Sequence, residues 1–169
     1  RRIAPGEIAR SKFQGAVLES TLTEDKVLLL KPTTFVNRTG QAVSEAVRFY
    51  KLTPEEDLLV LVDDTSLPCG RIRVRESGGT GGHNGLRDIT SHLGTDRWAR
   101  VRIGIDAPGQ IPLSSYVLGR FRDDQVDDVE LGIEQAADAA NCWITRGTTA
   151  AMNAFNADRE PSGSPEEKL

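Results

Sequence analysis

The sequence predicts an α/β fold, with a single domain built on a twisted mixed β-sheet that is flanked by helices. Two observations support this prediction. Short apolar runs typical of strands alternate along the chain with segments of helical periodicity. A chain of 169 residues with 38% hydrophobic residues can also bury one substantial core. We expect the domain to span residues 1–157, and residues 158–169, which are charged and lack apolar anchors, to form a disordered tail.

The beginning of the chain is expected to hold two strands and a helix. Residues 16–22 alternate loosely between apolar and polar side chains, and residues 23–26 have the composition of a turn. The continuous apolar run Val27–Leu30 then predicts a buried strand after an edge strand. From Gly40 to Tyr50 the apolar residues recur at spacings of one, three and four, which predicts a helix with one apolar face.

Two further strands are expected after this helix. The Thr53-Pro54 pair interrupts the helical pattern, and the apolar run Leu58–Val62 predicts a central strand that ends in Asp63 and Asp64. Residues 71–75 alternate between arginine and aliphatic side chains, which predicts a strand with the arginines on one face.

The second half of the chain follows the same alternation. A glycine-rich segment, residues 78–85, precedes a short helix that is expected from Leu86 to Leu93. Residues 101–105 predict another strand, and residues 108–117 a loop. Residues 123–146 are amphipathic and begin with acidic residues, which suit the amino-terminal end of a helix dipole, so a long closing helix is expected there.

Charge and cysteine content exclude several classes of protein. The net charge of −4 argues against a uniformly basic surface, so any RNA site must be a local cluster of basic residues. Cys69 and Cys142 lie far apart without a CxxC pair or histidines at zinc-finger spacing, so we expect reduced thiols, no metal and no cofactor. No apolar run is long enough to span a bilayer, and Arg1-Arg2 does not lead into a signal peptide. These features predict a cytoplasmic protein without a membrane partner.

Four local features are expected to converge on one site, because ligands of open α/β sheets bind beyond the carboxyl ends of strands. They are Thr33–Asn37, the pair Asp63 and Asp64, the segment Gly81–Gly85, and the arginines near Arg102. Asn37 can equally cap the helix that follows it. The two aspartates can equally form a solvated turn, although a carboxylate after a strongly apolar run often orients a base or a polar ligand.

The glycine-rich segment places His83 and Asn84 among residues that allow a ligand to approach the backbone. It lacks the Gly-Lys-Ser/Thr ending of a phosphate-binding P-loop and the spacing of a dinucleotide motif. A lone histidine in such a loop is more often structural than catalytic. From the residues alone, the natural hypothesis is a dyad in which Asp63 holds His83 and the imidazole activates water.

Three segments together resemble the bacterial peptidyl-tRNA hydrolase family in both order and spacing. They are Lys31–Gly40, Val62–Gly70 and Gly78–Leu86. The resemblance continues through Arg100–Ile105, the Tyr116–Leu118 loop and the closing helix, so it covers nearly the whole chain before the tail. It implies a metal-independent enzyme that hydrolyses the ester between peptide and tRNA and so recycles tRNA. Peptidyl-tRNA is the implied partner, and a monomer is the expected state when the chain is complete.

The roles that the resemblance implies differ from the dyad hypothesis. In this family a histidine near the amino terminus activates water, and an aspartate matching Asp63 keeps that imidazole oriented. His83 then becomes a supporting residue. The asparagines matching Asn37 and Asn84 hold the substrate and the attacking water, and their amides can donate to charge that develops on the ester carbonyl.

Apolar and basic residues complete the implied site. Phe35 and Val36 would line the same cleft, with Val36 at a position where the family commonly has methionine. Basic residues matching Arg75 and Arg102 lie where the family grips tRNA phosphates, and guanidinium groups suit phosphate oxygens. The alternative is that the arginines of residues 71–75 form a ladder that balances surface acids.

The chain departs from the family at its beginning. The family opens with a strand and the loop Gly-Leu-Gly-Asn-Pro-Gly, followed by a tyrosine and Thr-Arg-His-Asn, and nothing here matches them. Arg1 is expected to lie within or just after the next helix, so the water-activating histidine and one central strand are expected to be missing. This chain by itself is then expected to be inactive. The alternative function is that of a non-catalytic RNA-binding protein of the same fold, although Asp63, Asn37 and Asn84 favour the enzyme.

Overall fold

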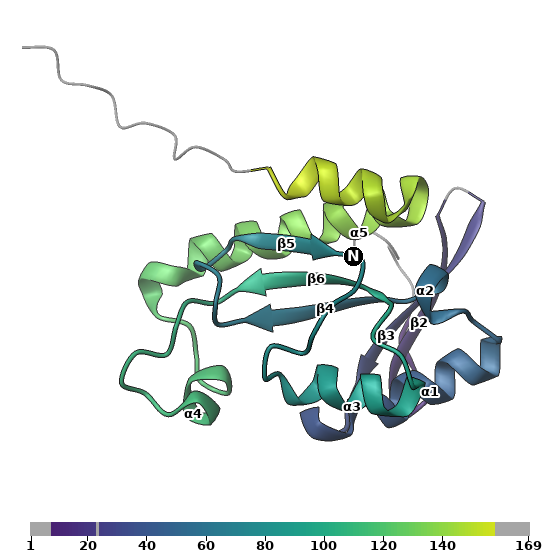
Figure 1. The fold of residues 1–169 in the computed structure, drawn as a ribbon, viewed down its shortest axis with the longest axis horizontal. Helices are drawn as coiled ribbons and strands as arrows, with labels where there is room; N and C mark the ends of the chain where they lie inside the picture. The colour runs from purple at the N-terminus through teal and green to yellow at the C-terminus, as the bar shows by residue number, and fades with distance from the viewer. Residues whose placement is uncertain (1–7, 23, 158–169) are drawn as a thin grey trace, which may run out of the picture.

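The strands of the computed structural model form two three-stranded sheets (Figure 1); the structure describes residues 8–22 and 24–157. The first sheet is an antiparallel meander of β1 (Arg10–Lys12), β2 (Gly15–Leu22) and β3 (Asp25–Pro32). The tight turn between β1 and β2 is made by Phe13 and Gln14, both at positive φ. The α/β class is therefore confirmed, and its strands are divided between two sheets.

The second sheet is mixed and has the order β4-β6-β5. Strand β6 (Ala99–Gly104) lies at its centre, parallel to β4 (Leu59–Asp64) and antiparallel to β5 (Ile72–Arg75). The prediction that the strand leading to Asp63 is central was wrong for the described residues, among which β4 pairs with β6 on one side only. The two aspartates are the last residues of the strand itself.

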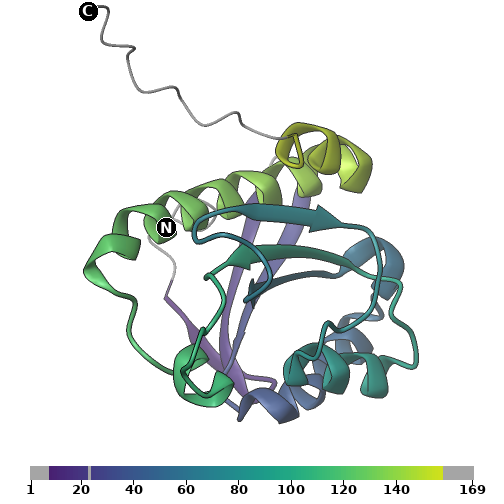
Figure 2. The same ribbon diagram turned by 60° about the vertical axis from the view of Figure 1, so that its left-hand side comes forward.

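Helices cover the second sheet on both faces. They are η1 (Val36–Arg38), α1 (Thr39–Tyr50), α2 (Pro54–Asp57), α3 (Asn84–Leu93), α4 (Leu113–Val117), η2 (Asp123–Gln125) and α5 (Val126–Phe155). α1 and α3 pack against each other below β4, whereas α5 crosses the opposite face over β5 and β6 (Figures 1 and 2). The layers therefore run helix pair, sheet, long helix.

Each face of the second sheet has its own apolar core. Between β4 and the helix pair lie Val43, Val47, Val62, Leu86, Ile89 and Trp98. Between β5, β6 and α5 lie Ile72, Val74, Val101, Ala136, Ala139 and Ala151. Small alanines on α5 let that helix approach the sheet closely, which holds β6 and its neighbours in place.

Several elements differ from the sequence-based predictions. The closing helix was expected to end at Arg146, and the helical geometry does break at the next residue, Gly147, where φ is 81° and ψ is 173°; a further helical segment, which was not expected, completes α5 to Phe155. The expected loop over residues 108–117 contains the short helix α4. The run Val27–Leu30 is half-buried because β3 faces a cleft between the two sheets. The predicted tail, residues 158–169, lies outside the described residues.

Two expectations from composition concern the thiols and membrane-spanning segments. Cys69 and Cys142 are both free thiols. No helix among the described residues is long and apolar enough to cross a membrane.

Candidate active site

The dyad suggested by the residues alone is present as a contact. Asp63, at the end of β4, lies with Oδ1 3.3 Å from Nε2 of His83. The hydrogen bond from His83 lowers the pKa of Asp63, and this effect outweighs burial, which acts in the opposite direction. Asp63 is therefore an ionised, partly exposed carboxylate with one oxygen engaged.

The second ring nitrogen of His83 is engaged as well. His83 is the N-cap residue of α3, and its Nδ1 accepts a hydrogen bond of 3.2 Å from the backbone N–H of Leu86. Because Nδ1 accepts from the backbone, the ring proton belongs on Nε2, which donates to Asp63. No ring lone pair remains to take a proton from water. This geometry supports a positioning role for His83 and not the role of general base.

The glycine-rich segment reaches Asp63 by crossing back over the sheet. Because β5 runs antiparallel to β6, Arg75 pairs with Arg100 at the far end of the sheet, and residues 76–83 must return to the end where Asp63 lies. Gly81 has φ 56°, and a Cβ there would come within 2.5 Å of the Arg102 guanidinium. The positive φ favours glycine at this position, and the absence of a Cβ leaves room for the end of the Arg102 side chain.

Asn37 and Asn84 come from neighbouring elements. η1 carries Asn37 and packs against α3, whose first residue is Asn84. A Cβ at Gly85 would lie only 3.3 Å from the carbonyl oxygen of Val36, so the two backbones are in close contact. Arg87 donates to Oδ1 of Asn84 at 3.2 Å, which directs the amide NH₂ of Asn84 away from that partner. The NH₂ group can then donate to a ligand.

Exposed apolar side chains lie beside these asparagines. Phe35 is 80% exposed and Val36 54% exposed, although both are large and apolar. Residues of this kind next to polar groups are typical of a binding surface.

Asp64 and Arg102 form an ion pair behind Asp63. Arg102 Nε lies 3.0 Å from Oδ2 of Asp64, but the angle does not make this contact a hydrogen bond. Oδ1 of Asp64 accepts from the backbone N–H and the hydroxyl of Ser66. Asp64 is 7% exposed, so its role is to hold Arg102 and the turn after β4.

The structure does not bring all the predicted arginines to this site. Arg71, Arg73 and Arg75 alternate with the buried Ile72 and Val74, which confirms the predicted arginine face. Arg75, however, lies level with Val60 along the sheet, three residues before Asp63, which is about 10 Å along a strand. Arg102 is near the carboxylates, and Arg75 is part of a surface further away.

Sequence reasoning missed a role for Arg100. Its side chain is fully buried, its guanidinium lies 3.7 Å from the centre of the Trp98 ring, and burial lowers its pKa. It donates to the carbonyl oxygens of Gly78, Asp96 and Trp98. A buried cation that binds backbone carbonyls fixes the start of the glycine-rich segment. The only signal in the sequence was its place two residues before Arg102.

The candidate site is built from polar side chains. Among the described residues, no group of three or more histidine, cysteine or acidic side chains is arranged to hold a metal ion. What the site offers is an ionised carboxylate, amide donors, a guanidinium group and exposed apolar surface. This set can orient a base, stabilise an oxyanion and hold a phosphate.

Comparisons with known proteins agree on one family. The family model of peptidyl-tRNA hydrolase matches residues 3–163. The peptidyl-tRNA hydrolase of Rhodopirellula baltica is 45% identical over 153 residues, which are 90% of this chain and 80% of the relative. That of Clostridium novyi is 42% identical over 150 residues, 89% of this chain and 79% of the relative.

Solved structures give the same result. A crystal structure of peptidyl-tRNA hydrolase from Acinetobacter baumannii superposes with a TM-score of 0.83 at 34% identity, and covers 90% of this chain and 78% of that one. A peptidyl-tRNA hydrolase in complex with N-propanol superposes with a TM-score of 0.84 at 32% identity, over 92% and 80% of the two chains.

Proposed function

The chain belongs to the peptidyl-tRNA hydrolase family, and from this premise we propose that its polar site binds peptidyl-tRNA and serves the hydrolysis of the ester between peptide and tRNA. The observation that carries the proposal is the state of Asp63. One oxygen is held by His83, and the other, Oδ2, has no side-chain hydrogen-bond partner within the described residues. A fixed carboxylate with one open oxygen is suited to orient a second imidazole.

Water activation is the step that Asp63 supports. Neutral water is a poor nucleophile, and an imidazole held by a carboxylate can take its proton as the ester is attacked. The sequence has two histidines. Both nitrogens of His83 are engaged, and His92 lies at the far end of α3, where Nδ1 contacts the carbonyl oxygen of Asp88 at 2.9 Å. In this proposal the imidazole that acts at Oδ2 of Asp63 is therefore neither His83 nor His92.

The two asparagines and the apolar pair bind the substrate in this proposal. The NH₂ group of Asn84 donates to the ester carbonyl as negative charge develops on its oxygen, which is worth most when the donor is already in place. Asn37 holds the terminal adenosine or the peptide, and Phe35 and Val36 contact the peptide. Exposed aromatic and aliphatic groups suit a peptide whose side chains vary.

Arg102 and Arg75 contact tRNA phosphates in this proposal. Arg102 lies beside the carboxylates and binds the phosphate nearest the ester, whereas Arg75, further along the sheet, binds one in the acceptor stem. Phosphate contacts position a nucleic acid without reading its sequence, so such a site accepts many tRNAs. The proposal also includes a monomer acting in the cytoplasm.

A second candidate function has one specific observation in its favour. Because neither imidazole of this chain is available at Asp63, the chain by itself is suited to bind RNA without hydrolysing it. The two candidates share the binding surface and differ in turnover.

Binding of an amide-linked peptidyl-tRNA analogue tests the shared part of the proposal. We expect the analogue to bind this chain more tightly than deacylated tRNA does, because the peptide contacts η1 and Asn84. Asn84→Ala should reduce that difference by about tenfold, the effect of roughly 1.4 kcal/mol. Asn153→Ala, an exposed asparagine on α5, is the matched control. Equal binding of the analogue and deacylated tRNA, or equal effects of the two variants, would contradict the proposal.

A further inference from the structure

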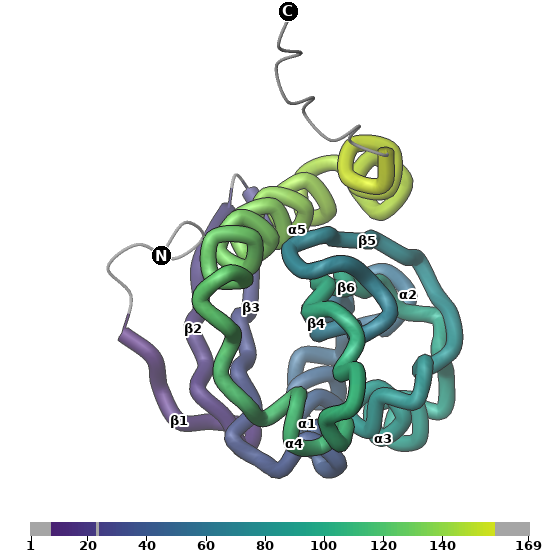
Figure 3. The backbone as a smooth tube through the Cα atoms, turned by 90° about the vertical axis from the view of Figure 1, so that its left-hand side faces the viewer, coloured from purple at the N-terminus to yellow at the C-terminus, as the bar shows by residue number. Residues whose placement is uncertain are grey.

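The two asparagines that are proposed to bind the substrate lie on different elements. Asn37 is in η1, which continues directly into α1, and Asn84 is the first residue of α3. α1 and α3 pack side by side on the same face of the second sheet (Figure 3). The separation between the two asparagines therefore depends on how the starts of these two helices are held together.

One side chain of α3 joins the two helix starts. Oδ2 of Asp88 accepts a hydrogen bond of 2.6 Å from the backbone N–H of Gly40, the second residue of α1. The N–H groups in the first turn of a helix need acceptors from outside the helix, and the positive end of the helix dipole favours a carboxylate there. The side chain of Asp88 is 19% exposed, so most of it is shielded from water. Asp88 therefore ties α3 to the first turn of α1.

This hydrogen bond lies about one helical turn away from each asparagine. Asn84 precedes Asp88 by four residues, so the two side chains lie on the same face of α3. Asn37 precedes Gly40 by three residues, which is one turn of a 3-10 helix. A shift at the contact between Gly40 and Asp88 would therefore move Asn37 relative to Asn84.

Close backbone contacts surround the hydrogen bond. A Cβ at Gly40 would lie 2.3 Å from the carbonyl oxygen of Asp88, so the two backbones leave no room for a side chain there. The hydroxyl of Thr39 donates to the carbonyl oxygen of Val36 at 2.8 Å, and the same oxygen is in close contact with Gly85. The starts of η1, α1 and α3 thus form one closely packed unit, in which Asp88 supplies a side-chain bond between the two long helices.

Asp88 is placed to act through its neighbours. Its other carboxylate oxygen, Oδ1, faces His92, whose Nδ1 is 3.5 Å away. Both oxygens therefore have neighbours within the protein, which favours a positioning role over direct contact with a ligand. The carboxylate also neutralises the positive start of α1, so the effects of its charge and of its hydrogen bond have to be separated by experiment.

We propose that Asp88 is a positioning residue for substrate binding. Its hydrogen bond to Gly40 holds η1 against α3 and so fixes the separation of the two asparagines. The inference rests on the proposed function, because it takes η1 and Asn84 to contact the peptide of peptidyl-tRNA. Donors in such a site are effective when they are already in place, and a displacement of about 1 Å can weaken their effect by roughly 10²-fold. Loss of the bond should therefore weaken recognition of the peptide more than it weakens contacts to the tRNA.

The test compares binding of the amide-linked analogue and of deacylated tRNA to chain 1–169 and its variants. Asp88→Ala should reduce the preference for the analogue by about tenfold, because the peptide contacts lose their fixed geometry. Asp88→Asn removes the charge but keeps an oxygen that can accept from Gly40, so its preference should stay within about threefold of the wild type. NMR spectra of the free proteins give a second readout. The side-chain amide signals of Asn37 and Asn84 should shift in Asp88→Ala and stay close to their wild-type positions in Asp88→Asn.

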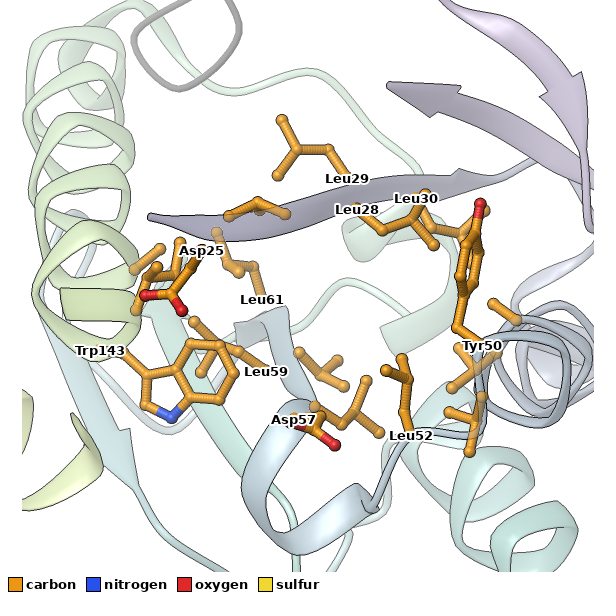
Figure 4. Close-up of a pocket in the computed structure, with 18 of the residues that line it drawn as sticks. Asp25, Leu28, Leu29, Leu30, Tyr50, Leu52, Asp57, Leu59, Leu61 and Trp143 are labelled. Atoms are coloured by element: carbon orange, nitrogen blue, oxygen red, sulfur yellow. The ribbon is translucent and has the colours of Figure 1, made fainter. Parts of the chain in front are cut away.

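Asp57→Ala is the matched control. Oδ2 of Asp57 accepts from the backbone N–H of Thr53 at 2.7 Å, so this substitution removes the same negative charge and a backbone bond of the same kind. Asp57 lies on α2 beside the cleft between the two sheets (Figure 4). Because α2 precedes β4, it lies beyond the opposite end of that strand from Asp63. The control should therefore leave both readouts unchanged.

The outcomes separate this inference from the proposed function. A wild type without preference for the analogue would contradict the proposed function, and the NMR signals would then still decide whether Asp88 fixes the asparagines, since that readout needs no tRNA. A preference that survives in Asp88→Ala, or that falls equally in Asp57→Ala, would overturn the positioning role alone. An equal loss in Asp88→Asn and Asp88→Ala would also overturn it, because the charge and not the bond would then act. If Asp88→Ala does not fold, Asp88→Glu takes its place, since it keeps the charge, moves the carboxylate by one methylene and should also lower the preference.

Discussion

Replacing Arg102 tests whether the guanidinium beside the carboxylates holds a tRNA phosphate. Arg102→Gln removes the charge and keeps most of the side-chain volume beneath Gly81. One lost phosphate contact should reduce the slope of log K against log salt by about one unit. Binding at low salt should fall accordingly, with the affinities of different tRNAs reduced alike.

The same substitution also affects the fold, and the structure sets the size of that effect. Asp64 is 7% exposed and loses its ion-pair partner, but it keeps two hydrogen bonds from Ser66. We therefore expect a loss of about 1–3 kcal/mol in the free energy of unfolding, the usual cost of a weakened buried polar group. Arg102→Glu would add repulsion to this loss, so the glutamine variant gives the cleaner measurement.

The assay is binding of the amide-linked analogue across a salt series, with urea unfolding of each variant. Arg97→Gln is the control, because Arg97 is 75% exposed and its ion pair with Glu55 lies on the surface. It makes the same change in net charge but should leave the salt slope unaltered. A wild-type slope in Arg102→Gln would remove Arg102 from the RNA site. An equal decrease in both variants would show that only net charge matters.

Three further predictions concern the carboxylates and their neighbours. In a protein extended by the amino-terminal motif of the family, Asp63→Asn should lower kcat by about 10²–10⁴-fold with little change in KM. Asp64→Asn should mainly reduce stability. Steady-state kinetics that show the reverse would mean that the roles of the two carboxylates are wrongly assigned. Because the pKa of Asp63 is lowered from its ordinary 3.8, the stability that its carboxylate contributes should be complete above that pH and be lost as the pH falls through the lowered value. An NMR titration of the Asp63 carboxyl carbon should give a midpoint below 3.8. His83→Ala should raise that midpoint, because it removes the hydrogen bond that lowers the pKa. Arg100→Met should reduce the free energy of unfolding, measured by urea unfolding, by roughly 3 kcal/mol, since three backbone carbonyls lose their donor. A variant as stable as the wild type would show that the buried cation is dispensable.

Local patterns predicted most of the elements in this fold. The helix from Gly40, the strand after Leu58 and the arginine strand at residues 71–75 all follow from periodicity over a few residues. The position of β4 at a sheet edge could not be predicted in this way, because strand order depends on pairing between distant segments. Asp106 is another example. It adopts φ 64° and binds the N–H of Cys69 and the side chain of Gln125, contacts that no nearby pattern signals.

The sequence predicted which residues belong to the candidate site better than it predicted how they contact one another. The motifs placed Asp63, His83 and Asn84 together, and the contact between the first two is present. The tautomer of His83 could not be predicted, because it depends on the N–H of Leu86 at the start of α3. Arg75 was grouped with Arg102 because both match basic positions of the family, whereas the antiparallel pairing of β5 places Arg75 opposite Arg100 and Arg73 opposite Arg102.

Turnover by chain 1–169 beside the version extended by the family motif tests the central claim most directly. The measurement is release of deacylated tRNA from peptidyl-tRNA, with the oligomeric state of both proteins determined in parallel. The account predicts hydrolysis by the extended protein and a negligible rate for the chain alone, because Asp63 has an open oxygen and no available imidazole to orient. Comparable turnover by the two would contradict it. His83 would then be the base, and His83→Ala should abolish the activity.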